Sequence, residues 1–102
     1  MSRFTLDPGV NDDLDAIWDY IGIQKCSPAS AVRQIELLYE KFVLLASHPM
    51  LGEARDDLAE NLRAFVARPF VVLYRPTHDG VQIVQVVHSA RDIQAVFRRK
   101  KS

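Results

Sequence analysis

The stretch from Gly80 to Asp92, GVQIVQVVHSARD, decides most of the fold. Its first half is a near-continuous apolar run, which is typical of a strand buried on both faces. The run ends at His88, and Ser89 and Asp92 are residue types that commonly begin a helix. We therefore expect a strand in the centre of a sheet, followed over 90–99 by a short helix with three inward-facing apolar residues, Ile93, Val96 and Phe97.

Two more strands are predicted just upstream. Over 62–67 the apolar residues Leu62, Ala64 and Val66 alternate with the residues between them, which is the period of a strand. After a break at Arg68-Pro69, a second apolar run covers 70–74, and residues 76–80 carry a strong turn signal. On this alternation Arg63 points away from Leu62 and Ala64, toward the solvent face.

Two amphipathic helices precede these strands, after a short strand candidate at 4–6. Asp7-Pro8 and Ser27-Pro28 each combine a capping residue with a first-turn proline. Apolar residues then recur at helical spacing, first at Val10, Leu14, Ile17, Trp18 and Ile21, and later at Ala31, Ile35, Leu38, Phe42 and Leu45. Four carboxylates, Asp12, Asp13, Asp15 and Asp19, are expected on the other face of the first helix. Leu37 and Leu44 widen the apolar face of the second.

The order of these elements is β-α-α-β-β-β-α, which predicts one α+β domain over residues 1–102. The two helices form an antiparallel hairpin that covers one face of the sheet. The other face is expected to be partly open, and an open apolar face is a place for a partner chain to dock.

Composition restricts the functional class. The sequence has no apolar run of about 18 residues, no signal peptide and one cysteine, Cys26. We therefore expect no membrane anchor, no internal disulfide and a reducing cytoplasm. Cysteine and histidine show no paired ligand spacing, so no metal site is expected.

Charge is unevenly divided although the formal net charge is zero. Residues 1–50 hold 4 Lys/Arg against 7 Asp/Glu, and residues 51–102 hold 9 against 6. The half that contains the main strands is therefore basic, which favours an anionic partner. The neutral total argues against tight, nonspecific duplex binding.

Five arginines lie in or beside the predicted strands, namely Arg55, Arg63, Arg68, Arg75 and Arg91. Their guanidinium groups suit phosphates and carboxylates, although each alone is equally compatible with a solvated sheet edge. His88 could act as a general acid or base, but a lone histidine is more often structural. His88, Ser89 and Asp92 do not form a hydrolytic triad, because neighbouring strand residues point in opposite directions.

In their order along the chain, these segments resemble the ParE branch of the RelE/ParE toxin superfamily. The segments are Asp13-Leu14 with 17–21, Phe42 with Leu45-Ala46, Pro49 with Gly52 and Arg55, Leu58, Leu62-Arg63, Phe70 with Tyr74-Arg75, and His88-Ser89-Ala90-Arg91-Asp92. The resemblance covers about residues 14–97. It implies a helical hairpin on a small twisted antiparallel sheet.

The resemblance also implies a function. A ParE-like toxin is neutralised by a DNA-binding, ParD-like antitoxin that wraps its apolar grooves in a hetero-oligomer. It binds DNA gyrase and blocks replication without a catalytic residue or a cofactor. Target contacts are then expected at the five arginines and His88. Antitoxin contacts are expected at Trp18, Tyr20, Leu37 and Leu44, although Trp18 and Tyr20 are also compatible with the core.

Two alternatives stay open. A RelE-like relative would cut messenger RNA on the ribosome, with His88, Arg63, Arg75 and Tyr74 as the catalytic set converging on one basic face. The sequence has no tyrosine or histidine after Asp92, and its total charge is neutral, so the gyrase hypothesis is favoured. The other alternative is a non-toxic relative that serves only as a binding partner or decoy.

Overall fold

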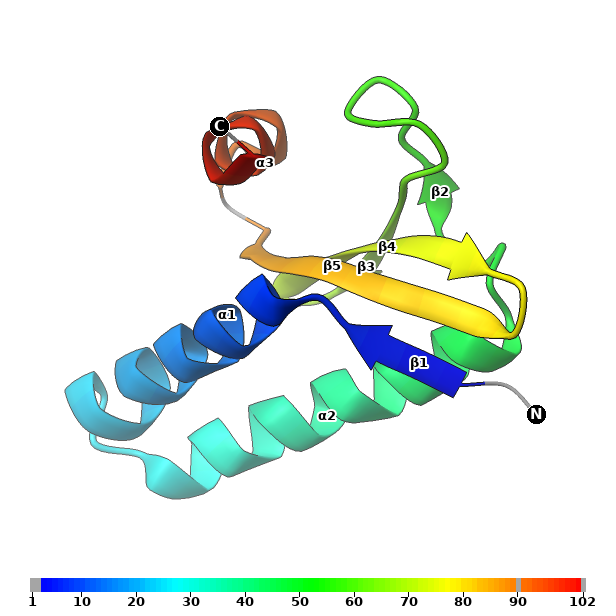
Figure 1. The fold of residues 1–102 in the computed structure, drawn as a ribbon. Helices are drawn as coiled ribbons and strands as arrows, with labels where there is room; N and C mark the ends of the chain where they lie inside the picture. Colours follow the sequence, from blue (N-terminus) through cyan, green and yellow to red (C-terminus); the bar gives the residue numbers. More distant parts are fainter. Residues whose placement is uncertain (1–2, 90, 102) are drawn as a thin grey trace.

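The computed structural model describes residues 3–89 and 91–101, the last four of them by their backbone alone. The elements that it forms are shown in Figure 1 and occur in the order β1 (Arg3–Leu6), α1 (Pro8–Trp18), η1 (Asp19–Gln24), α2 (Pro28–Ser47), β2 (Glu53–Ala54), β3 (Arg63–Ala67), β4 (Phe70–Thr77), β5 (Gly80–His88) and α3 (Ile93–Lys101).

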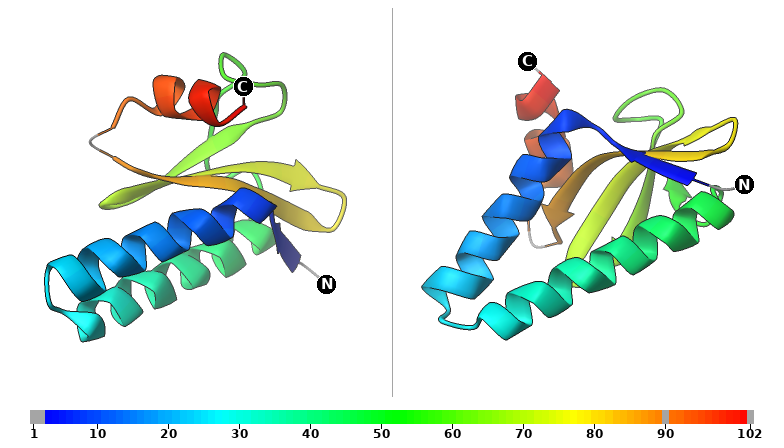
Figure 2. Two further views of the ribbon diagram at one scale, coloured as in Figure 1. Left: turned by 60° about the vertical axis from the view of Figure 1, so that its left-hand side comes forward. Right: turned by 60° about the horizontal axis from the view of Figure 1, so that its bottom comes forward.

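The α+β class and the helical hairpin are confirmed. The sheet lies between the α1–α2 hairpin on one face and α3 on the other (Figure 2). Both predicted helix starts are correct, since Pro8 and Pro28 open α1 and α2. The pattern did not predict the π-helical turn η1, which prolongs α1, or the two-residue strand β2. No helix within residues 3–89 and 91–101 has the length and apolar character needed to cross a membrane.

The sheet is mixed, not wholly antiparallel as expected. Its strand order is β1-β5-β4-β3-β2. From β2 to β5, each strand pairs antiparallel with the next one along the chain. In contrast, β1 runs parallel to β5, with pairs from Arg3↔Gly80 to Leu6↔Ile83. The central strand is therefore β4, and the strand that ends at His88 lies beside it. Because β1 and β5 are far apart in the sequence and are joined through two helices, no local sequence pattern shows whether the two strands pair parallel or antiparallel.

The main core fills the space between the hairpin and the sheet. Val10, Leu14 and Ile17 of α1 and Leu38 and Phe42 of α2 are buried there against the helix-facing residues of β4 and β5. The rings of Phe4, Tyr39 and Phe42 pack with centroids 5.3–6.1 Å apart and fix β1 against α2. The predicted apolar stripes therefore form the core, apart from Trp18, whose side chain is 37% exposed.

The second face of the sheet is covered, which corrects the expected open face. Val71, Leu73, Val84 and Val87 are buried there beneath Phe97 of α3 and beside Leu62, with further contacts from Leu58, Ala59, Ile93 and Val96. The three inward positions predicted for the terminal helix are thus correct. The helix begins at Ile93, where the Asp92 carboxylate accepts a hydrogen bond from Ala95 N at 3.2 Å. Ala90, the expected start, lies outside the described residues.

Candidate functional site

The six residues expected to contact a target fall into two groups at opposite ends of the sheet. Arg63 lies opposite Tyr74 in the β3–β4 register, whereas His88 lies opposite Phe70. Four strand residues, or about 13 Å, separate these two rows. Arg55, Arg63 and Arg75 therefore belong to one end of the sheet, and Arg68, His88 and Arg91 belong to the other.

In the first group, Arg55 and Arg63 form hydrogen bonds within the chain. The Arg55 guanidinium donates two hydrogen bonds to Asp57, at 2.9 and 3.0 Å, which raise the pKa of Arg55 above its usual value. Arg63 donates from Nε to Gly52 O at 2.9 Å and from Nη2 to Met50 O at 3.1 Å. The expected solvent-facing position of Arg63 is wrong, because Arg63 shares the helix-covered face with Tyr74, which lies directly opposite.

Tyr74 completes this network from the core. Its side chain is fully buried, and its hydroxyl accepts from Gly52 N at 2.8 Å and donates to Pro49 O at 2.7 Å. A Cβ at Gly52 would lie only 2.7 Å from that hydroxyl, so the loop needs glycine at this point. The Pro49-to-Gly52 motif is therefore a loop that Tyr74 and Arg63 hold in place.

The set expected for the nuclease alternative does not converge. Arg63 and His88 share one face but lie at opposite ends of the sheet. Arg75 follows Tyr74 and so points to the other face. The Tyr74 hydroxyl is buried and already bonded to two backbone groups. We find no shared position among these four side chains where one phosphate could meet them all.

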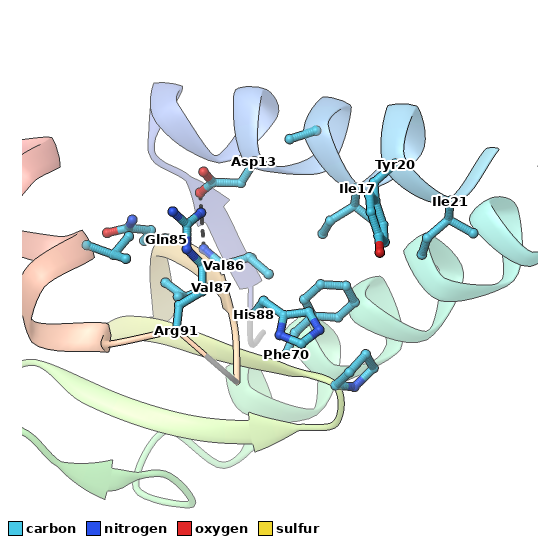
Figure 3. Close-up of a pocket in the computed structure, with 13 residues that line it drawn as sticks. Asp13, Ile17, Tyr20, Ile21, Phe70, Gln85, Val86, Val87, His88 and Arg91 are labelled. Atoms are coloured by element: carbon cyan, nitrogen blue, oxygen red, sulfur yellow. Dashed lines mark hydrogen bonds between the residues drawn. The ribbon is translucent and has the colours of Figure 1, made fainter. Parts of the chain in front are cut away.

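At the second end of the sheet, a groove of about 500 Å³ separates α1 and η1 from the end of β5 (Figure 3). We call it the α1–β5 groove. Ile17, Ile21 and Phe70 supply apolar surface, and the Phe70 ring meets the His88 ring edge-on at 5.7 Å. Its other lining residues are Asp13, Ala16, Tyr20, Pro69, Gln85, Val86, Val87, His88, Arg91 and Val96.

Sequence reasoning missed Asp13. This residue was expected on the polar face of α1, yet its carboxylate is half-buried and accepts a hydrogen bond from Val86 N at 3.1 Å (Figure 3). The spacing offered a signal, because Asp13 stands three residues after Val10 and next to Leu14, at the border of the apolar stripe.

A second groove, of about 340 Å³, lies between α2 and β3, and we call it the α2–β3 groove. Leu37 lines it together with the cationic residues Lys41 and Arg68. Of the side chains expected to bind an antitoxin, Tyr20 lies in the α1–β5 groove and is 52% exposed. Trp18 is exposed on α1, and Leu44 is half-buried on α2 outside both grooves.

The chain is similar to known toxins over nearly its whole length. Residues 4–93 match the family described as ParE toxin of type II toxin-antitoxin system, parDE. Toxin ParE3 of Caulobacter vibrioides is 31% identical over 101 residues, covering 98% of this chain and 99% of that protein. Toxin ParE1 of Mycobacterium tuberculosis is 27% identical over 93 residues, covering 90% and 94%.

A solved structure shares the fold. It is described as the chromosomal ParDE TA system from P. aeruginosa and superposes with a TM-score of 0.69 at 22% sequence identity. The match covers 86% of this chain and 96% of that one. The similarity therefore extends from the sequence to the arrangement of the hairpin and the sheet.

Proposed function

Because the chain belongs to the ParE family of type II toxins, we propose that it halts bacterial growth by binding DNA gyrase in the cytoplasm. A cognate antitoxin neutralises it. The observation that carries this proposal is the family match over residues 4–93. Bound toxin holds gyrase on cleaved DNA, so replication stops, and no group of the toxin itself makes or breaks a bond.

The arrangement of the basic residues supports binding over chemistry. A nuclease needs a base, an acid and cations around one phosphate. Here Arg63 and Tyr74 hold a loop at one end of the sheet, and His88 lies at the other end. These positions suit separate structural and binding roles.

We place the target contacts at the second end of the sheet. Arg68, His88 and Arg91 are exposed there. Arg55 and Arg63 are half-buried and hydrogen-bonded within the chain at the first end. Because the two grooves border the exposed group, an antitoxin seated in them covers the target contacts and neutralises the toxin by overlap.

The first experiment is to express the chain alone in a bacterium and pulse-label DNA, RNA and protein synthesis. DNA synthesis should fall first, and co-expression of the cognate antitoxin should restore it. Purified toxin should also accumulate cleaved DNA on purified gyrase. If protein synthesis fell first, the ribosomal nuclease would replace this proposal, and if growth continued unchanged, the chain would be a non-toxic relative.

His88 gives a second test. The variant His88→Ala should keep most of the toxicity. In a binding inhibitor the substitution removes one contact, and no proton-transfer step depends on the imidazole. A loss on the order of 100-fold or more would instead have the size expected for a catalytic acid or base. The exposed His78 in the β4–β5 turn provides the matched control, His78→Ala.

A further inference from the structure

The loop over residues 49–52 presents two apolar side chains to solvent. Met50 is 69% exposed, the most of any large hydrophobic residue that the structure describes, and Leu51 is 50% exposed. The backbone beneath them is fixed, because the Tyr74 hydroxyl and the Arg63 guanidinium together make four hydrogen bonds to it. A side chain on an ordered loop loses little conformational entropy when a partner binds it. The loop is therefore suited to be an apolar anchor in a protein–protein contact.

The α2–β3 groove has a matching apolar lining. Leu37, Leu38 and Val66 contribute to it, and the Val66 side chain is 56% exposed. The edge of β3 is open at this point, because β2 pairs only with Arg63 and Ala64 of β3. The volume of about 340 Å³ lies near the lower end of the range of ligand pockets, about 300–1,000 Å³. A few side chains from a loop suit this space better than a folded segment does.

The loop and the groove carry opposite charges. Lys41 and Arg68 line the groove, and neither has an ion-pair partner among the residues that the structure describes. The residues three and four positions from Lys41 on α2 are all leucines, so no carboxylate neighbours it at helical spacing. Glu53 is exposed directly after the loop. The apolar loop is thus followed by a carboxylate, and the apolar groove carries two cations.

The loop and the groove lie along the same side of the molecule. The loop follows the end of α2 and is bonded to Arg63 at the start of β3, whereas the groove joins the middle of α2 to the end of β3. At 1.5 Å per residue, the helix from Leu37 to His48 separates them by roughly 16 Å. Leu44 lies between them, on the same helical stripe as Leu37 and Lys41.

A second copy of the chain complements this side. Rotation about a two-fold axis between loop and groove places the loop of each copy on the groove of the other, so both contacts form at once. The same rotation brings Glu53 of each copy to the cations Lys41 and Arg68 of the other. Leu44, near the axis, meets its own counterpart. Charge and shape therefore agree on one occupant for the groove.

We propose that the toxin without its antitoxin forms a two-fold symmetric homodimer through this side of α2 and β3. Met50 and Leu51 of each copy enter the α2–β3 groove of the other and pack on Leu37 and Val66. Under the proposed function an antitoxin also occupies this groove, so the homodimer belongs to the toxin alone. The inference does not depend on the identity of the target.

Sedimentation equilibrium of the full chain tests the homodimer. The toxin is purified under denaturing conditions and refolded, so that no antitoxin is present, and circular dichroism verifies the fold. Over about 1–100 µM, the measured mass should rise to that of two chains and no further. A single-chain mass throughout this range would overturn the inference. A series of larger oligomers would also overturn it, because the contact would not close.

A variant of the loop tests where the copies meet. Met50→Lys should raise the dissociation constant of the homodimer about tenfold or more, because it sets a cation against the cations of the groove. Ile23→Lys is the matched control, since Ile23 is 63% exposed on η1 and lines neither groove. This control should leave the dissociation constant unchanged. Equal dissociation constants for the two variants would place the contact elsewhere and overturn the inference.

A charge exchange tests the pairing across the contact. Glu53→Lys and Lys41→Glu should each weaken the homodimer roughly threefold to tenfold. The double variant should associate more tightly than either single variant, because it restores the pair with its charges exchanged. Arg33→Glu, exposed on α2 outside both grooves, is the control and should have no effect. A double variant no tighter than the single ones would contradict the pairing.

The outcomes separate this inference from the proposed function. If the toxin stops DNA synthesis but sediments as a single chain, the proposed function stands and the homodimer is wrong. If the homodimer forms and responds to Met50→Lys while gyrase is unaffected, the homodimer stands and the proposed target is wrong.

Discussion

At the scale of single residues, Tyr74 shows how position changes the meaning of a side chain. In the sequence it is one of two plausible proton handlers near the end of the chain. In the structure its hydroxyl is buried and links Gly52 N to Pro49 O, on a loop that Arg63 also holds. The same hydroxyl that suits acid–base chemistry therefore satisfies two backbone groups of a connection that lacks regular structure.

The variant Tyr74→Phe should destabilise the fold by about 1–3 kcal/mol, because it leaves the buried Gly52 N–H and the partly buried Pro49 C=O without their shared partner. The free energy of unfolding in urea measures this loss. Tyr39→Phe is the matched control, since Tyr39 is partly exposed and its ring packs on Phe4 and Phe42. Equal stability of the two variants would contradict the role assigned to the Tyr74 hydroxyl.

Gly52 gives a second prediction at this scale. Gly52→Ala should cost about 1–3 kcal/mol of unfolding free energy, because the added methyl would lie within 2.8 Å of the Tyr74 hydroxyl and of Ala64 O. Gly22→Ala is the control, with its nearest contact at 3.4 Å to Ala31. Thermal unfolding should show little change for Gly22→Ala and a clear drop for Gly52→Ala, and the reverse order would refute the argument.

At the scale of secondary-structure elements, α3 is a cover for the second core. Phe97 is buried against the second face of the sheet, where Val71, Leu73, Val84 and Val87 also lie. Without α3 these valines and this leucine would meet water. The terminal helix is therefore part of the folded domain, and the face it covers is not available for docking.

Phe97→Ala should accordingly destabilise the chain by about 3–5 kcal/mol, as a large core side chain is removed. Exposed Val43 on α2 provides the control, and Val43→Ala should change stability by less than about 0.5 kcal/mol. Chemical denaturation of both variants decides the question. A small effect of Phe97→Ala would mean that α3 is only loosely docked.

Local patterns predicted most elements of this fold. The spacing of Val10, Leu14 and Ile17 predicted the buried stripe of α1, and the apolar run of β5 predicted burial on both faces. These features are encoded by neighbours within one element. The parallel pairing of β1 with β5 is not, since it depends on where a distant segment returns. The register shift between Leu73 and Tyr74 in the β4–β5 pair was not predicted either.

The candidate site was less predictable than the fold. Tyr20 was expected to contact the antitoxin, and His88 and Arg91 were expected to contact the target, yet the structure brings all three to one groove. Alternation alone placed Arg63 on the wrong face, because Phe65 and Ala67, which share its face, pack against the main core. The place of Asp13 at the border of the apolar stripe indicated partial burial, but its bond to Val86 N depends on the distance between α1 and β5, which the spacing within α1 does not give.

At the scale of the whole molecule, the two ends of the sheet have different tasks under the proposed function. Arg91→Glu, at the exposed end, should reduce both growth arrest and antitoxin binding. Arg75→Glu, at the other end and on the opposite face, should change neither by more than about twofold. Growth curves and titration calorimetry measure the two effects. A stronger loss of toxicity from Arg75→Glu would move the target contacts to the first end.

The pairing of β1 with β5 also determines when, during its synthesis, the chain can complete its fold. The first described strand finds its neighbour only after the last strand has been synthesised. Translation of the 41 residues from His48 to His88 takes about 2–8 s at ordinary rates. A chain truncated after Thr77 should cause no growth arrest, which expression of that fragment would test. We therefore expect a ribosome that stalls before β5 to release a fragment that lacks the β1–β5 pair and does not arrest growth.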